Sequence, residues 1–195
     1  MKHRPDGAAI LLVQAVTLSR VILTLLFVTT ALTPRYRIHA MVFFVCAAGS
    51  DLIDGSLARR LNAVTRGGGA LDLFGDKFLT ICSVLFAVAR GIDLLPCSLI
   101  VLREIFLSCI RGVHVDGQPV IPPTRVLGTI TATTIRLSTL ALLLQQTATR
   151  NPSESINTLF YLVAAFYALS LTYRIVSNRE RLLSAFCPER RQGTR

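Results

Sequence analysis

Charged residues are scarce in this sequence. Only 16% of its 195 residues are charged, 52% are hydrophobic, and the mean hydropathy is +0.56. Several apolar runs approach or pass the roughly 18–20 residues that are needed to cross a hydrocarbon core of about 30 Å. The composition therefore excludes an ordinary soluble domain and indicates a single helical membrane domain that crosses the bilayer several times.

Acidic residues are scarcer than basic ones. There are 11 acidic residues against 21 basic ones, and arginines far outnumber lysines, so the net charge is +10. The basic residues fall in short loops and near the C-terminal end, with no separate soluble basic module, so we expect no nucleic-acid partner. The charge instead suits membrane topology, attraction to anionic lipid head groups and a phosphate-bearing substrate.

Cysteine pairs with metal-ligand spacing are also lacking. The five cysteines are scattered, and none forms a C-x-x-C motif. We expect them to be small buried residues, with no disulfide and no metal site among them. The apolar run near the start is interrupted by Gln14, Ser19 and Arg20 without a convincing cleavage site, so we expect it to be retained.

Six helices are expected along the chain, and they predict an all-α, polytopic membrane fold. Their approximate ranges are 8–32, 38–61, 70–90, 94–111, 124–147 and 156–176, followed by a basic tail at 177–195 that is partly disordered at its end. An even number of spans puts both termini on one side. That side collects most of the arginines, so the positive-inside rule predicts cytoplasmic termini in a multi-pass protein of the inner membrane.

Four of the 11 acidic residues lie in one stretch, at Asp51, Asp54, Asp72 and Asp76. The spacings i, i+3 and i, i+4 put each pair on one helix face, and the short turn between the helices makes them antiparallel neighbours. Four ionised carboxylates would repel one another strongly in a low dielectric, so either some are protonated or cations neutralise them. All-oxygen ligands favour Mg²⁺ or Mn²⁺, with Ca²⁺ next, and four carboxylates can hold two such ions.

Small residues and an arginine accompany the aspartates. Gly55, Ala58 and Gly68 leave room for a bulky group against the backbone, and Arg59 is a good phosphate partner through its planar fork. Together with metal ions, these features suggest a nucleotide diphosphate. A membrane ion transporter is the main alternative, because acids inside a membrane also carry ions or protons. An aspartate-rich prenyltransferase is another, although it would carry two distant acidic motifs and more helices.

The acidic stretch resembles a family signature. D-x-x-D-G-x-x-A-R, eight residues and G-x-x-x-D-x-x-x-D is the pattern of the CDP-alcohol phosphotransferases, and eight positions match it without a gap. The resemblance implies six membrane helices, a homodimer, and a reaction in which an alcohol displaces CMP at a site near the cytoplasmic surface. It also implies the roles of the matching residues: Asp51, Asp54, Asp72 and Asp76 bind metal, Asp76 is the catalytic base, and Asp51, Gly55, Ala58, Arg59 and Gly68 bind the CDP group.

A second segment suggests the branch of the family. Arg103-Glu104-Ile105 resembles the Arg-Glu-Ile of the bacterial phosphatidylglycerophosphate synthases, which implies CDP-diacylglycerol as donor and glycerol 3-phosphate as acceptor. Arg103, Arg111 and Arg125 would then form a cationic pocket for the acceptor phosphate. The alternative for Arg103 is a structural ion pair with a helical acid, although the adjacent Glu104 is expected to point elsewhere.

Two departures from that branch leave the acceptor open. Gln14 stands where the branch has Asn ahead of Thr17 and Arg20, and Thr129 and Thr131 stand where it has lysines. Arg125 could replace those lysines; otherwise the acceptor is inositol phosphate, serine or phosphatidylglycerol. Three further residues have alternative interpretations. Thr17 and Arg20 face the same pocket or anchor the membrane boundary, while Lys77 balances the site's charge or snorkels to the interface.

Overall fold

The computed structural model describes residues 7–60, 66–111, 114–115, 118–121, 125–148 and 154–186. Within these ranges, the side chains of residues 7–13, 34, 51–60, 66–72, 111, 114–115, 118–119, 125, 148, 184 and 186 lie outside the description. What the sequence predicts for those side chains therefore remains a prediction, while the helices and strands that carry them can be placed.

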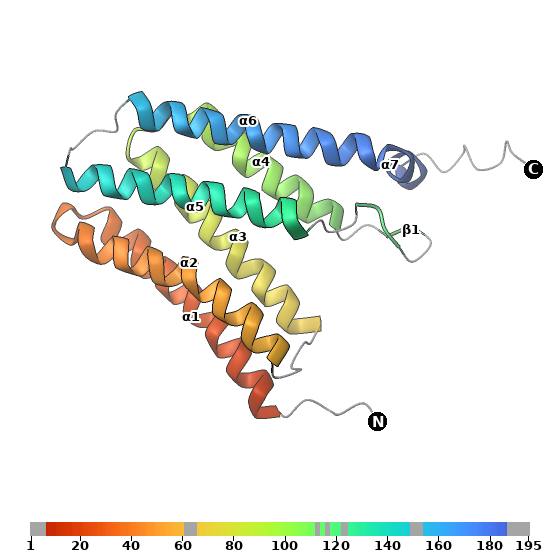
Figure 1. Ribbon diagram of the computed structural model, residues 1–195, viewed down its shortest axis with the longest axis horizontal. Coiled ribbons are helices and arrows are strands. Elements are labelled where there is room, and N and C mark those ends of the chain that lie inside the picture. Colours follow the sequence, from red (N-terminus) through yellow and green to blue (C-terminus); the bar gives the residue numbers. More distant parts are fainter. Residues whose placement is uncertain are drawn as a thin grey trace, which may run out of the picture.

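Six long helices dominate the part of the chain that the structure describes, so the all-α fold class is confirmed. They are α1 (Gly7–Ala31), α2 (Arg37–Arg60), α3 (Arg66–Ala89), α4 (Leu94–Arg111), α5 (Arg125–Ala148) and α6 (Glu154–Ser177), with a short 3₁₀ turn, η1 (Pro34–Tyr36), before α2. Figure 1 shows that successive helices alternate in direction, so α1 begins and α6 ends at the same end of the bundle. The end of α2 and the start of α3, which carry the acidic stretch, also lie there.

A short β-hairpin and a short helix were not expected from the sequence. Strands β1 (His114–Val115) and β2 (Gln118–Pro119) pair antiparallel within the connection between α4 and α5. The first part of the predicted basic tail forms helix α7 (Arg179–Phe186), an element that was not predicted. Leu182 and Ala185 share one face of α7, because they are three residues apart. That face packs against a small apolar cluster formed by Leu107, Ile110, Val120 and Ile121.

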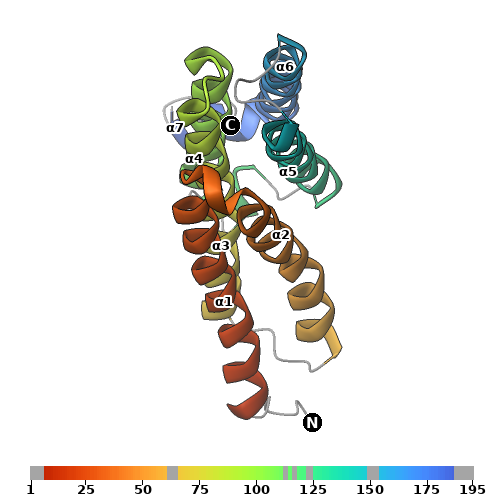
Figure 2. The same cartoon turned by 90° about the vertical axis from the view of Figure 1, so that its left-hand side faces the viewer.

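Aromatic side chains join the first three helices. Phe27 of α1 is fully buried, and its ring centroid lies 5.1 Å from that of Phe44 on α2 and 5.3 Å from that of Phe86 on α3. Tilted and edge-on ring pairs at such distances are favourable beyond the apolar area that they bury. Helix α1 is therefore the common support for α2 and α3, and Figure 2 shows it alongside α3.

Large apolar side chains cover the outside of the bundle. Every one of the six long helices exposes at least one, for example Ile22, Ile38, Leu85, Leu102, Leu137 and Leu169. Three helical segments are long and apolar enough to cross a membrane, judged by length and composition within the described residues: Gln14–Ala31, Val126–Thr147 and Glu154–Ser177. An apolar exterior around buried polar groups is the arrangement expected in lipid, where apolar side chains need no shielding.

Two arginines bind helix ends at the opposite end of the bundle from the acidic stretch. Arg37 donates a hydrogen bond from Nη1 to the backbone carbonyl of Gln146 near the end of α5. Arg90 donates in the same way from Nη2 to the carbonyl of Ala31, the last residue of α1. The last carbonyls of a helix have no partner within the helix, so both contacts satisfy groups that would otherwise be costly in lipid.

The cysteine prediction is partly correct. Cys82 and Cys97 are buried, whereas Cys46 and Cys109 are exposed on the surface of the bundle. All four are free thiols.

Candidate active site

The acidic stretch occupies the last turns of α2 and the first turns of α3. Asp51, Asp54, Gly55, Ala58 and Arg59 lie on the backbone of α2, and Gly68, Asp72 and Asp76 on that of α3. The helical backbone makes each aspartate pair share a face, as expected. Asp76 is the one member of this set whose side chain falls within the described residues. No three His, Cys, Asp or Glu side chains gather around a common point among the side chains that are described.

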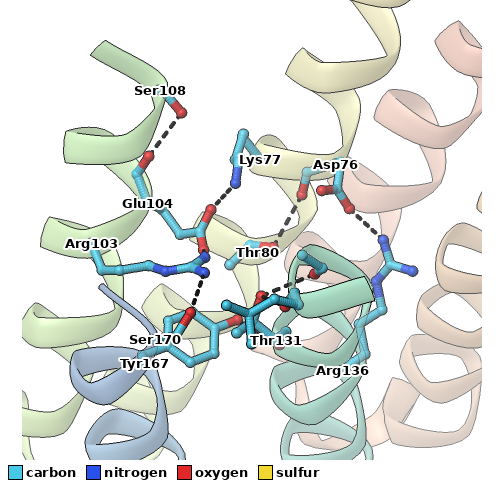
Figure 3. Close-up of polar contacts among 12 residues, drawn as sticks. Asp76, Lys77, Thr80, Arg103, Glu104, Ser108, Thr131, Arg136, Tyr167 and Ser170 are labelled. Atoms are coloured by element: carbon cyan, nitrogen blue, oxygen red, sulfur yellow. Dashed lines mark hydrogen bonds and ion pairs between the residues drawn. The ribbon is translucent and has the colours of Figure 1, made fainter. Parts of the chain in front are cut away.

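The carboxylate of Asp76 is half-buried and contacts an arginine from another helix. Its Oδ1 accepts a hydrogen bond from Nη2 of Arg136 on α5, and the two side chains form an ion pair. The Asp76 side chain is 26% exposed and that of Arg136 is 14% exposed. Figure 3 shows the two side chains pointing toward each other between α3 and α5. The pair therefore fixes α5 beside the residue that is expected to act as the base.

Arg136 was missed by the sequence reasoning. It is the only charged residue of α5 beyond Arg125, in a helix that is otherwise apolar or rich in threonine. A charged residue inside a predicted membrane helix is itself a signal of function, because an isolated charge is costly in lipid. That signal was available from the sequence, although the partner of Arg136 was not.

Arg20 lies between the two acidic segments and is fully buried. Its Nε donates a hydrogen bond of 3.1 Å to the hydroxyl of Ser50, the residue before Asp51. On its other side is Gly75, the residue before Asp76: a Cβ placed there would lie 3.5 Å from Cδ of Arg20 and 3.6 Å from Cγ2 of Thr17. Both Thr17 and Arg20 thus lie inside the bundle beside the acidic stretch, which rules out the alternative of anchors at the membrane boundary.

A buried charged cluster joins α3 to α4 and α6. Glu104 forms ion pairs with Lys77 through Oε2 and with Arg103 through Oε1, and the Arg103 guanidinium also donates to the hydroxyl of Ser170 at 3.2 Å. Figure 3 shows these side chains converging in the space between the three helices. The prediction that Glu104 points away from Arg103 is wrong. Lys77 pairs with Glu104 on the neighbouring helix instead of snorkelling to the interface.

Helices α5 and α6 are joined by Tyr167. Its fully buried hydroxyl donates a 2.7 Å hydrogen bond to the backbone carbonyl of Thr131, and the Arg103 guanidinium lies 4.8 Å from its ring centroid. The hydroxyl of Thr131 in turn is within hydrogen-bonding distance of the carbonyls of Leu127 and Gly128, at 3.0 and 2.9 Å. Thr131 therefore serves helix packing at a position where the related branch carries a lysine.

The remaining acceptor-pocket candidates lie at the same end of the bundle. Arg111 ends α4 and Arg125 begins α5, but their side chains fall outside the described set, so their contact with a phosphate stays a prediction. Arg174 on α6 was not expected to matter. It is buried, and its Nη2 lies 4.0 Å from where a Cβ of Gly128 would be. Helix α6 thus brings a cation beside the altered segment of α5.

Comparison with known proteins identifies the family. The sequence profile described as CDP-alcohol phosphatidyltransferase matches residues 10–173, which is most of the chain. The chain belongs to this family. Members of the family are transferases that generally use divalent metal ions. The family membership and the long apolar helices together make the chain a multi-pass membrane protein, and it carries the acidic stretch that is typical of the family.

Three curated relatives that the chain resembles share the name CDP-diacylglycerol–glycerol-3-phosphate 3-phosphatidyltransferase. The chain is 36% identical to the protein from Rickettsia bellii over 80 residues, which is 40% of this chain and 44% of the relative. It is 30% identical to that of Rickettsia typhi over 112 residues (57% and 60%) and 37% identical to that of Blochmanniella floridana over 102 residues (49% and 53%). The matched segments thus span about half the length of these relatives.

Proposed function

We propose that this protein transfers the phosphatidyl group of CDP-diacylglycerol to glycerol 3-phosphate, giving phosphatidylglycerophosphate and CMP in phospholipid biosynthesis. The observation that carries the proposal is the eight-position acidic pattern on α2 and α3, inside a chain that matches the family profile over residues 10–173. The names of the curated relatives support the choice of donor and acceptor.

The reaction is a single displacement at phosphorus. A hydroxyl oxygen of glycerol 3-phosphate forms a bond to the β-phosphorus of CDP-diacylglycerol, while the bond from that phosphorus to the CMP oxygen breaks. We assign Asp76 as the group that takes the hydroxyl proton, because its carboxylate is half-buried and held by Arg136. A base placed within hydrogen-bond reach of the attacking hydroxyl accelerates such a step.

Divalent cations fit the donor set of this site. We propose that Asp51, Asp54, Asp72 and Asp76 hold two Mg²⁺ or Mn²⁺ ions, since hard cations prefer carboxylate oxygens. Arg136 contacts Oδ1 of Asp76, and we assign Oδ2 to the metal and substrate side. When bound, such ions stabilise the charge on the attacking and leaving oxygens of a phosphoryl displacement.

The CDP group and the acceptor phosphate are assigned to different residues. Asp51, Gly55, Ala58, Arg59 and Gly68 line the nucleotide in this proposal, as the family pattern implies. For the acceptor phosphate we favour Arg111 and Arg125, with the buried Arg174 as a further candidate. Arg103 becomes the weakest of the three original candidates, because its guanidinium contacts Glu104, Ser170 and the ring of Tyr167.

We propose that α1 to α6 all cross the inner membrane, with both termini and the active site facing the cytoplasm. Five of the six helices have 24 or 25 residues and are about 36 Å long or slightly longer, which is enough for a hydrocarbon core of about 30 Å, while α4, with 18 residues, is about 27 Å long and close to that thickness. The exposed apolar side chains on all six helices favour six spans over the three segments that qualify by composition alone. Helices α2, α3 and α4 carry charged residues of the proposed site. A homodimer among membrane lipids is expected from the family resemblance.

The absence of charge at two positions near the start of α5 supports an alternative acceptor. Thr129 and Thr131 bring no charge to the start of α5, and Thr131 hydrogen-bonds within its own helix. The same chemistry with inositol phosphate, serine or phosphatidylglycerol is therefore the alternative function.

Purified protein incubated with CDP-diacylglycerol and each acceptor in turn, with CMP as the readout, separates these possibilities. We expect glycerol 3-phosphate to give the fastest release of CMP. Faster release with another acceptor would change the acceptor and keep the reaction class. Ion flux in vesicles without any release of CMP would favour a transporter instead.

A further inference from the structure

Arg136 has a specific partner in the proposed active site. Its Nη2 contacts Oδ1 of Asp76, and both side chains are largely buried between α3 and α5. Thr80 hydrogen-bonds the backbone carbonyl of Asp76 at 3.1 Å, one helical turn further along α3. The side chain of Asp76 is therefore held by Arg136, while its backbone remains part of an ordinary helix.

Apolar side chains of α3 and α5 also belong to one buried core. Leu79, one turn after Asp76, and Ile135, the residue before Arg136, are both fully buried in the same apolar core. Placing a guanidinium inside a membrane helix is costly, and an apolar residue would join the two helices at lower cost. The charge on Arg136 is thus better explained by the chemistry of Asp76 than by helix association.

The position of Arg136 on α5 supports the same view. Arg125, Thr129 and Arg136 are separated by four and seven residues, close to one and two turns, so they lie on one face of the helix. Thr129 brings no charge to that face. Arg136 supplies a cation there that directly contacts the proposed base.

We propose that Arg136 is a positioning residue for Asp76. By holding Oδ1, its planar guanidinium fixes the rotation of the carboxylate, so that Oδ2 faces the reacting hydroxyl. This inference rests on the proposed transfer reaction. Groups that orient a ligating or reacting side chain through a hydrogen bond typically change activity by roughly 10–100-fold when they are removed.

The test uses three variants of the purified full-length protein: Arg136→Gln, Arg136→Lys and Arg37→Gln. Arg37 is a matched control, because it also contacts α5 but binds the carbonyl of Gln146, about 15 Å further along the helix. For each protein, kcat and the KM for CDP-diacylglycerol and for glycerol 3-phosphate are measured from CMP release. Thermal unfolding in the same detergent is recorded alongside.

We expect Arg136→Gln to lower kcat by roughly 10–100-fold with both KM values within about threefold of the wild type. Arg136→Lys should recover part of the loss, because it restores the charge without the planar fork. Arg37→Gln should keep its kcat. If Arg136→Gln does not fold, the Arg136→Lys variant is judged alone and should show a reduced kcat at unchanged KM.

Three results would overturn the inference: an unchanged kcat in Arg136→Gln, a rise in the KM for glycerol 3-phosphate at constant kcat, or an equal loss in Arg37→Gln. A change confined to KM would make Arg136 a substrate-binding residue instead. Failure of the proposed function is distinguished from these results, because the wild-type protein itself would then release no CMP with any acceptor.

Discussion

Gly75 gives Arg20 its place beside the acidic segment of α3. A Cβ at position 75 would meet Arg20 and Thr17 at 3.5 to 3.7 Å, which is ordinary van der Waals contact. Gly75→Ala should therefore keep activity within about twofold of the wild type, whereas Gly75→Leu should displace the Arg20 side chain and lower activity by roughly tenfold or more. CMP release by the two variants, compared at equal amounts of folded protein, checks this. Equal activity of both would show that the position of Arg20 does not matter.

Asp76 is the residue on which the proposed chemistry depends most. Asp76→Asn removes the proton acceptor and one charged oxygen, so we expect CMP release to fall by at least about 100-fold. The matched control is Asp93→Asn, in the turn between α3 and α4 at the opposite end of the bundle. There the Asp93 carboxylate accepts hydrogen bonds from Asn157 and Tyr161. Near wild-type turnover in Asp76→Asn, measured beside that control, would remove Asp76 from the role of base.

At the scale of single residues, the spacing of residues along one helix could be predicted, whereas contacts between different helices could not. The i, i+3 and i, i+4 spacings of the aspartates were sufficient to place each pair on one helix face, because helical geometry is local. The partners of Lys77, Arg103 and Asp76 were beyond reach, since each comes from a helix whose rotation about its axis the sequence does not specify. Glu104 illustrates the limit: it was expected to point away, yet it pairs with both Arg103 and Lys77.

Helices α3 and α4 are joined by the ion pairs of Glu104. Removing its charge with Glu104→Gln leaves Arg103 and Lys77 without their shared counterion in a buried setting. Breaking a buried pair in this way costs about 3–5 kcal/mol, so a clear drop in the unfolding temperature is expected. Thermal unfolding in detergent measures it, with Glu154→Gln on the exposed first turn of α6 as control. The same unfolding temperature in both variants would contradict a stabilising role for the cluster.

The long helices were predictable as elements, and the short ones were not. Apolar runs interrupted by turn signals gave six ranges, each of which overlaps one long helix of the structure, with bounds that differ by at most four residues. The largest difference is at α3, which begins at Arg66 although glycines at positions 67–69 suggested a turn up to that point. Helix α7 and the hairpin of β1 and β2 are too short to have a periodic signal. In the folded chain, Leu182 and Ala185 of α7 pack against a small apolar cluster that includes Val120 and Ile121, the two residues after β2.

Among the described residues, the bundle has an apolar exterior and buries charged side chains such as Arg20, Glu104 and Arg174. In the proposed site four carboxylates hold two divalent cations, so removal of divalent metal should abolish turnover. We expect a chelator to stop the release of CMP, and excess Mg²⁺ or Mn²⁺ to restore it. Calcium is a useful control, because it binds oxygen ligands in a looser geometry than Mg²⁺. Unchanged turnover in chelator would exclude the two-metal arrangement.

The all-α membrane class followed from composition, while the identity of the acceptor did not. Hydropathy and the distribution of arginines are properties of the whole chain, and they predicted a helical membrane protein. In the proposed function, the acceptor depends on a few cations along α5 and on the helices around it. There the structure adds Arg136, whose charge inside an apolar helix was a signal that the sequence reasoning missed, and Arg174, which the sequence reasoning did not consider.

The most direct test of the proposed transfer follows both products in one reaction. Purified protein is given radiolabelled CDP-diacylglycerol, glycerol 3-phosphate and Mg²⁺, and CMP and phosphatidylglycerophosphate are quantified over the same time course. A single displacement predicts that the two products appear at equal rates, and that neither appears when glycerol 3-phosphate is omitted. Release of CMP without the lipid product, or formation of neither product by folded protein, would contradict it.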